Sequence, residues 1–215
     1  MPVPLKIDFV SDISCPWCVI GLRALEQAMA RLDGQVAVDL HFQPFELNPQ
    51  MPPGGQDIDE HLQQKYGSTP EQAAMVRERI RAAGAALGFT FSLQTRSRIY
   101  NTFDAHRLLH WAALEGRQLA LKQALFQAYF TDGEDPSNHQ VLIRAAARVG
   151  LDATRAARIL DSNEFAAVVR KEQAFFLDQG IHAVPAVIIN NQHLIQGGQP
   201  VEVFEQALRQ IAGLA

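Results

Sequence analysis

The chain has 215 residues, a formal net charge of −4 and 47% hydrophobic residues, which is typical of a globular protein of one or two domains. This charge excludes the wholly basic surface that binds nucleic acid or anionic lipid, and no apolar run reaches the roughly 20 residues that cross a bilayer. We therefore expect no nucleic-acid partner and no membrane partner.

The first predicted element is a strand over residues 5–10, which is apolar apart from Lys6 and Asp8. These two charges interrupt the apolar residues at once, whereas a secretory signal has an uninterrupted apolar core. We therefore expect a cytoplasmic protein. A reducing cytoplasm disfavours a permanent structural disulfide.

Helical periodicity begins at Pro16, with apolar side chains at three- and four-residue steps as far as Leu32, and Gly34 marks the end of this helix. Alternating apolar residues then predict a second strand over residues 36–43. The order strand, helix, strand is a βαβ unit, and Cys15 lies at its first strand-to-helix turn.

A loop rich in proline and glycine at 44–57 precedes a long segment with almost no strand pattern. Strand patterns return only at 184–190 and 193–196, before a last helix from Pro200. The sequence thus predicts an α/β core formed by residues 1–57 and 180–215, interrupted by an all-helical insertion at 58–179. Within the insertion we expect helices at 69–87, 102–115, 119–130, 138–149, 152–160 and 163–179.

Cys15 and Cys18 are the main chemical signal, because a Cys-x-x-Cys pair beside a βαβ unit is typical of a thioredoxin-like redox motif. The free N–H groups at a helix start favour a thiolate, and Cys15 lies nearer to them than Cys18. We expect Cys15 to attack a substrate disulfide and Cys18 to resolve the mixed disulfide. Pro16 and Trp17, between the two thiols, are expected to tune the redox potential and to contact the substrate.

Two cysteines at this spacing also occur in a structural zinc site, as a chance pair of buried thiols or in a stable disulfide. Zinc needs about four ligands, and the sequence has no second cysteine pair. His106 and His110 have the spacing of a zinc-protease pair, but no glutamate lies between them. We therefore expect no metal. His106 stays a candidate to line a cleft near Cys15.

Val184-Pro185 stands where the α/β core resumes. A thioredoxin-like fold needs a cis-proline loop here, facing the cysteine pair, whose backbone pairs with an extended peptide or glutathione. In the alternative interpretation, Pro185 is in trans and only begins an edge strand.

Asp8 lies in a segment that otherwise suits a buried strand, and a buried carboxyl group commonly has a functional reason. We regard it as a candidate to exchange a proton with Cys18 during resolution. The alternatives are a solvated position at the strand end and an ion pair with Lys6 or Arg23. Asp12 is the weaker candidate, because it lies in the turn.

Residues 9–18 (FVSDISCPWC), Val184-Pro185 and the helical insertion resemble the DsbA-like thioredoxin superfamily. Residues 101–108 and 180–190, with QGGQP at 196–200, are similar to its FrnE-like dithiol–disulfide oxidoreductases. The resemblance covers essentially the whole chain. It implies a thioredoxin fold with a helical insertion and thiol–disulfide oxidoreductase or isomerase activity. It also implies that Pro185 is the cis-proline and that the backbone of Val184 pairs with substrate.

Kappa-class glutathione transferases and 2-hydroxychromene-2-carboxylate isomerases share this architecture, but they typically carry a serine where this chain has Cys15. They hold glutathione in the stretch that Val184, Gly198 and Gln199 occupy here, so the resemblance implies glutathione as a co-substrate and no other cofactor. These relatives are often dimers, which leaves a homodimer open.

Three functions therefore remain open. The two thiols favour an oxidoreductase that acts on a disulfide-containing protein or small molecule and is recycled by glutathione or a thioredoxin-type partner. The second is a glutathione-dependent isomerase or transferase of a small aromatic compound. The third is a non-catalytic, chaperone-like binding module.

Overall fold

The computed structural model describes residues 1–92 and 97–214, and its centre is a mixed sheet with the strand order β2-β1-β5-β6. Strand β1 pairs in parallel with β2 and antiparallel with β5, and β5 forms a hairpin with β6. The strands are β1 (Val3–Ser11), β2 (Val36–Pro44), β5 (Ala186–Ile189) and β6 (His193–Gln196). The sheet thus joins a βαβ unit from the start of the chain to a hairpin from its end.

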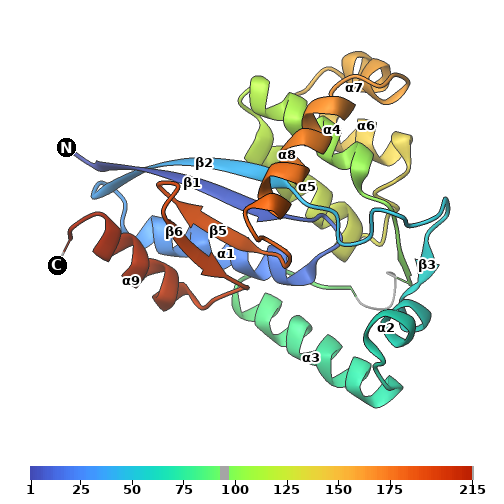
Figure 1. Cartoon of the computed structure of the whole chain (residues 1–215), viewed down its shortest axis with the longest axis horizontal. Coiled ribbons are helices and arrows are strands. Elements are labelled where there is room, and N and C mark those ends of the chain that lie inside the picture. The colour runs from blue at the N-terminus through green and yellow to red at the C-terminus, as the bar shows by residue number, and fades with distance from the viewer. Residues whose placement is uncertain (93–96, 215) are drawn as a thin grey trace.

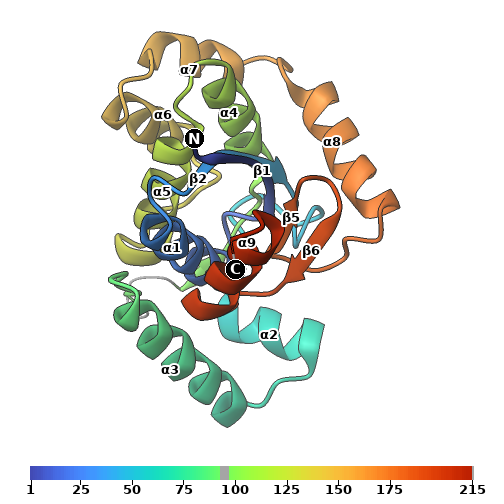
Figure 2. The ribbon, with the colours of Figure 1, turned by 90° about the vertical axis from the view of Figure 1, so that its left-hand side faces the viewer.

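Helices cover both faces of this sheet, with α1 and α9 on one face and α8 on the other (Figures 1 and 2). In the described residues no helix is long and apolar enough to cross a membrane. The helices are α1 (Pro16–Arg31), α2 (Ile58–Tyr66), α3 (Pro70–Ala86), α4 (Phe103–Leu114), α5 (Gln118–Phe126), α6 (His139–Arg148), α7 (Ala153–Leu160), α8 (Ala166–Asp178) and α9 (Val201–Ile211), and α5 runs on into a π-helical turn, η1 (Gln127–Thr131).

The two faces of β1 belong to two different parts of the core. Successive side chains of a strand point to opposite faces, so Ile7 and Phe9 pack in the large cluster with α1 and α9. Val10 instead packs with Phe176 and Ile181 near the end of α8. A residue of β1 therefore has access either to the α1 side or to the α8 side, and this decides which residues can reach the cysteines.

The inserted segment has two separate parts (Figures 1 and 2). Helices α2 and α3 form an arm that projects beyond one end of the sheet. Helices α4 to α7 gather beside β2 and α8. Two short strands, β3 (Gln56–Asp57) and β4 (Arg98–Ile99), pair antiparallel at the base of the arm and were not expected from the sequence.

Helix α2 was also not expected. It has almost no apolar stripe, since only His61 is buried, so its periodicity is weak. Its ends are well defined instead. The side chain of Asp57 accepts hydrogen bonds from the backbone N–H groups of Asp59 and Glu60, and Gly67 ends the helix with a φ of 65°.

Candidate active site

Cys15 is the residue immediately before α1, at the turn that follows β1. Its backbone is extended, with φ −91° and ψ 112°, and Pro16 takes the first helical position, where a missing N–H costs nothing. No acidic residue lies in the first turn of α1. The N–H groups and the dipole of α1 therefore act on Cys15 without an opposing negative charge from that turn.

Cys18 lies one helical turn behind Cys15, and both are free thiols. The backbone N–H of Cys18 donates to the carbonyl of Cys15 at 3.1 Å. Cys18 is fully buried, whereas 4% of Cys15 is exposed. Burial, followed by the hydrogen bond and charge of Cys15, raises the pKa of Cys18 well above its usual range. The surroundings of Cys18 therefore favour its neutral thiol form.

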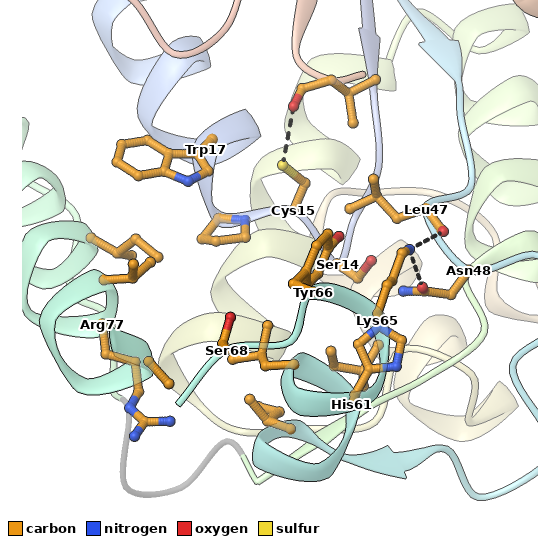
Figure 3. Close-up of a pocket in the computed structure, with 18 of the residues that line it drawn as sticks. Ser14, Cys15, Trp17, Leu47, Asn48, His61, Lys65, Tyr66, Ser68 and Arg77 are labelled. Atoms are coloured by element: carbon orange, nitrogen blue, oxygen red, sulfur yellow. Dashed lines mark hydrogen bonds between the residues drawn. The ribbon is translucent and has the colours of Figure 1, made fainter. Parts of the chain in front are cut away.

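The proline loop faces the exposed thiol. The Val184–Pro185 peptide bond is cis, and the Sγ atom of Cys15 donates to the carbonyl of Val184 at 3.6 Å (Figure 3). The loop approaches α1 very closely. A Cβ atom on Gly21 would lie 3.1 Å from Cγ of Pro185, and one on Gly198 would lie 2.9 Å from the carbonyl oxygen of Trp17.

A cavity of about 870 Å³ opens beside Cys15, between the sheet and the α2–α3 arm (Figure 3). This volume is within the usual range for small-molecule sites. The cavity is lined by Cys15, Pro16, Trp17 and Val184 on the cysteine side and by His61, Lys65, Tyr66, Val76 and Arg77 from the arm, among others. Pro185 and Cys18 are not among its lining residues.

The arm places polar groups across the cavity from the thiol. Lys65 Nζ donates to the carbonyl of Leu47 at 2.8 Å and to Asn48 at 2.7 Å (Figure 3). Burial, followed by the charge of Cys15, raises the pKa of Tyr66. Burial, followed by the charge of Lys65, lowers the pKa of His61.

Behind the cysteines lies a buried polar cluster around Asp12. Its carboxylate accepts from Thr102 Oγ1 at 2.7 Å, from the backbone N–H of Leu47 at 2.7 Å and from Ser14 Oγ at 2.9 Å. Burial raises the pKa of Asp12, but the nearby His106, together with the Leu47 and Thr102 bonds, lowers it to about 2. The sequence analysis ranked Asp8 above this residue, because Asp12 lies in the turn.

A second buried ionisable group, Lys122 of α5, was missed entirely. Its side chain is fully buried, and its Nζ atom has no hydrogen-bond partner in the described part of the chain. A signal was present, since Lys122 stands three and four residues before Leu125 and Phe126, on an apolar helical stripe.

Besides Cys18 and Pro185, four other predicted site residues do not line the cavity. Asp8 is on the α8 face, where it accepts from Lys6 Nζ at 2.7 Å and from Gln43 at 2.6 Å. The structure thus shows the alternative ion pair and does not bring Asp8 to Cys18. His106 is buried behind the site, with Nε2 3.6 Å from Asp12 Oδ1, so it does not line the cleft.

Gly198 and Gln199 are also absent from the cavity lining. Gly198 packs against α1, and Gln199 donates to the carbonyl of Gln196 at 2.7 Å. Within residues 1–92 and 97–214, no group of three or more His, Cys, Asp or Glu side chains is arranged to hold a metal ion.

The fold and the site together define a class: thioredoxin-fold proteins in which a dithiol pair begins the first helix and a cis-proline loop faces the outer sulfur. More narrowly, residues 6–209 match the DSBA-like thioredoxin domain, and the chain belongs to that family. The expected superfamily and the expected fold, an α/β thioredoxin fold with inserted helices, are thereby confirmed.

Three relatives illustrate the range of the family. The chain is 32% identical to a probable DsbA oxidoreductase, SCO1869, from Streptomyces coelicolor, with a TM-score of 0.89 over 98% of this chain and 91% of that one. It is 26% identical to the uncharacterized protein YwbO of Bacillus subtilis over 97% of this chain and 96% of YwbO. The cytosolic disulfide reductase DsbM of Pseudomonas aeruginosa, solved with glutathione, shares the fold at 18% identity and a TM-score of 0.68, over 97% of this chain and 100% of DsbM.

Proposed function

We propose that the protein is a thiol–disulfide oxidoreductase in which Cys15 is the nucleophile and Cys18 the resolving thiol. The observation that carries this proposal is the asymmetry of the pair. Cys15 lies at the start of α1 and lines a large cavity, whereas Cys18 is sealed behind it. Only the sulfur of Cys15 can therefore contact a substrate, and the sulfur of Cys18 can react only with Cys15.

The reaction follows from this arrangement. The thiolate of Cys15 attacks one sulfur of a substrate disulfide, the substrate S–S bond breaks, and one substrate thiolate leaves and takes a proton from water. The thiolate of Cys18 then attacks Sγ of Cys15, which forms the internal disulfide and releases the second substrate thiol. The substrate gains two electrons and the cysteine pair loses them. The same steps in reverse transfer a disulfide to a substrate.

The cavity supports a substrate of peptide or small-molecule size. The side chains of Trp17 and Val76 supply apolar surface, and Lys65 supplies a cation. We expect the carbonyl of Val184, which accepts from Sγ of Cys15, to pair with an extended substrate backbone. Such a site suits a disulfide on a short peptide, including oxidised glutathione. We further propose that the enzyme works in the cytoplasm and that glutathione or a thioredoxin-type protein recycles it.

Trapping of the mixed disulfide tests the proposal directly, because the chain has only two cysteines. With oxidised glutathione, Cys18→Ser is expected to accumulate one stable glutathione adduct by mass spectrometry, on Cys15. The unmodified protein is expected to release it and form the internal disulfide, and Cys15→Ser is expected to lose insulin reduction by glutathione. Full activity of Cys15→Ser would refute the proposal.

The same variants distinguish the alternatives. A glutathione-dependent isomerase needs only a group that holds glutathione beside the cavity, so its activity would survive Cys18→Ser. A chaperone-like module would suppress aggregation equally well after both thiols are replaced.

A further inference from the structure

Helix α2 presents one histidine to the cavity. His61 is the buried residue of this helix, and it lines the cavity that contains Cys15 (Figure 3). Its Nδ1 atom lies 2.8 Å from Oε1 of Gln56. The other ring nitrogen, Nε2, has no hydrogen-bond partner in the described part of the chain, and it is not among the buried atoms that lack one. Nε2 is therefore an accessible polar atom on a side chain that lines the cavity.

A chain of hydrogen bonds fixes a proton on Nδ1. A carboxylate only accepts hydrogen bonds, so the 2.9 Å contact between Glu60 and Gln64 must use the amide nitrogen of Gln64. The amide oxygen of Gln64 then accepts from Nε2 of Gln56 at 2.8 Å. This leaves the amide oxygen of Gln56 to face His61, and because that oxygen can only accept, Nδ1 of His61 carries the proton. In the neutral ring the lone pair is then on Nε2, which is a hydrogen-bond acceptor.

The surroundings of His61 favour the neutral ring. Burial, followed by the charge of Lys65, lowers the pKa of His61 below its ordinary value of 6.5. The accepting form therefore predominates at neutral pH. The other titratable and charged groups on the elements around the ring are Cys15 at the start of α1, Glu46 after β2, Asp57 of β3, Asp59, Glu60 and Tyr66 of α2, Arg77 of α3, Arg98 of β4 and His182 before the proline loop.

Lys65 makes this part of the cavity electropositive. It follows His61 by four residues, so the two side chains lie on the same side of α2, and its Nζ atom is hydrogen-bonded to neutral oxygens of Leu47 and Asn48. The carboxylates that line the cavity have partners elsewhere, which are Arg77 for Asp59, Arg170 for Glu46 and the first N–H groups of α2 for Asp57. A cationic donor such as an ammonium group is therefore disfavoured here, whereas an uncharged N–H group is not.

We propose that His61 determines specificity for peptide disulfides, because its Nε2 atom accepts a hydrogen bond from an amide N–H group of the substrate. Gln56 is the positioning residue that holds the ring in this form. The inference rests on the proposed function, since it assigns a binding role within the same cavity. His61 lies on the arm, across the cavity from the thiol, so the N–H group belongs to a part of the substrate away from the reacting S–S bond. Oxidised glutathione has such groups, and a short alkyl disulfide has none.

Binding without exchange measures this contact. Cys15→Ser removes the reactive sulfur, so calorimetry with oxidised glutathione then reports non-covalent binding. In that background, His61→Phe is expected to raise the Kd about fivefold, the effect of losing one hydrogen bond. An analogue of oxidised glutathione with a methyl group on every amide nitrogen is expected to have the same Kd with and without His61. An unchanged Kd of His61→Phe for oxidised glutathione would overturn the inference.

The pH dependence of the Kd tests the role of Gln56. Protonation of Nε2 removes its lone pair, so binding is expected to weaken only below pH 6.5. Gln56→Glu places a carboxylate against Nδ1 and favours the charged ring, so the weakening is expected to begin at a higher pH. Gln63→Glu adds the same charge at an exposed position of α2 that does not line the cavity, and it is expected to shift the profile much less. Equal profiles for the two variants would contradict the positioning role.

A measurement on the unmodified protein does not depend on the stability of any variant. The nitrogen chemical shifts of the His61 ring, measured by nuclear magnetic resonance, report which atom carries the proton. We expect a protonated Nδ1 and an unprotonated Nε2 at neutral pH. A proton on Nε2 would overturn the inference.

Turnover separates the inference from the proposed function. His61→Phe is expected to raise KM for oxidised glutathione about fivefold with little change in kcat, and to leave the reduction of diethyl disulfide unchanged. If KM and Kd for oxidised glutathione do not respond to His61→Phe, the inference is refuted and the oxidoreductase remains. If the unmodified protein reduces neither disulfide but the Kd still responds, the proposed function is refuted and His61 remains a binding residue.

Discussion

Asp12 links three segments that are distant in the sequence. Its carboxylate joins the turn before Cys15 to Leu47, after β2, and to Thr102, at the start of α4. Burial opposes the charged form, but the neighbouring His106, together with the Leu47 and Thr102 bonds, holds the pKa of Asp12 at about 2, against an ordinary value of 3.8. The carboxylate therefore stabilises the fold above the unfolded pKa, and this stability is lost as the pH falls through the folded pKa.

Asp12→Asn tests this contribution. At neutral pH the substitution is expected to lower the free energy of unfolding by about 2 kcal/mol, the size that such a pKa difference implies. The loss is expected to shrink as the pH falls from about 4 to about 2, where the native carboxylate also becomes protonated. Urea unfolding across this range measures it.

Asp33→Asn, at an exposed aspartate, is the control. Its free energy of unfolding is expected to change with pH in the same way as that of the unmodified protein. If the free energy of unfolding of Asp12→Asn followed that of the unmodified protein at every pH, the Asp12 carboxylate would make no pH-dependent contribution to stability.

At the residue scale, the sequence predicted Cys15 and Cys18 as a redox pair and Pro185 as the proline of the loop that faces them. The types and spacing of these residues are enough for that prediction. It did not identify the buried polar groups behind them. The importance of Asp12 and Lys122 depends on segments that fold over the turn, which no local pattern of residues describes.

At the scale of elements, the start of α1 and the proline loop form one unit held by close backbone contacts. Gly21 and Gly198 permit this approach, since a Cβ atom at either position would press on Pro185 or on the carbonyl of Trp17. The position of the Val184 carbonyl beside Cys15 depends on this packing.

Gly198→Ala is therefore expected to displace the loop, because its Cβ atom would lie 2.9 Å from a backbone oxygen. Overpacking of this kind costs about 1–3 kcal/mol. We also expect the rate of Cys15 attack on dithiobis(nitrobenzoate) to change, which stopped-flow absorbance measures. An unchanged rate together with an unchanged unfolding midpoint would show that the loop does not depend on this contact.

The regular elements were predicted well where an apolar stripe or an alternating pattern marks them, as in α1, β1 and the inserted helices from α3 to α8. Helix α2 and the two short strands at the base of the arm were not predicted, because caps and tertiary contacts define them instead of an apolar pattern. For the same reason the sequence did not predict the part of the candidate site that α2 supplies, including His61, Lys65 and Tyr66.

At the scale of the molecule, the site lies between the sheet and the α2–α3 arm (Figure 3). Cys15 lies on one side of the cavity, and the arm supplies the opposite wall. The arm should therefore govern which substrates bind, without changing the reactivity of the thiols.

Two adjacent positions on α3 test whether the arm governs substrate binding without changing the reactivity of the thiols. Val76 lines the cavity, whereas Met75 does not, and both are exposed. Val76→Asp is expected to raise KM for oxidised glutathione about fivefold, equivalent to about 1 kcal/mol of binding, with little change in kcat. Met75→Asp, the matched control, is expected to change neither constant. Equal effects at the two positions would contradict a specific role for the arm.

The reduction potential of the Cys15–Cys18 couple tests the account most directly. The protein is equilibrated with mixtures of reduced and oxidised glutathione, free thiols are trapped by alkylation, and the species are counted by mass spectrometry. We expect a single two-electron transition between the dithiol and the internal disulfide, at a potential between about −270 and about −120 mV. Absence of the internal disulfide across this range, or a persistent glutathione adduct on Cys15 with Cys18 still reduced, would contradict it.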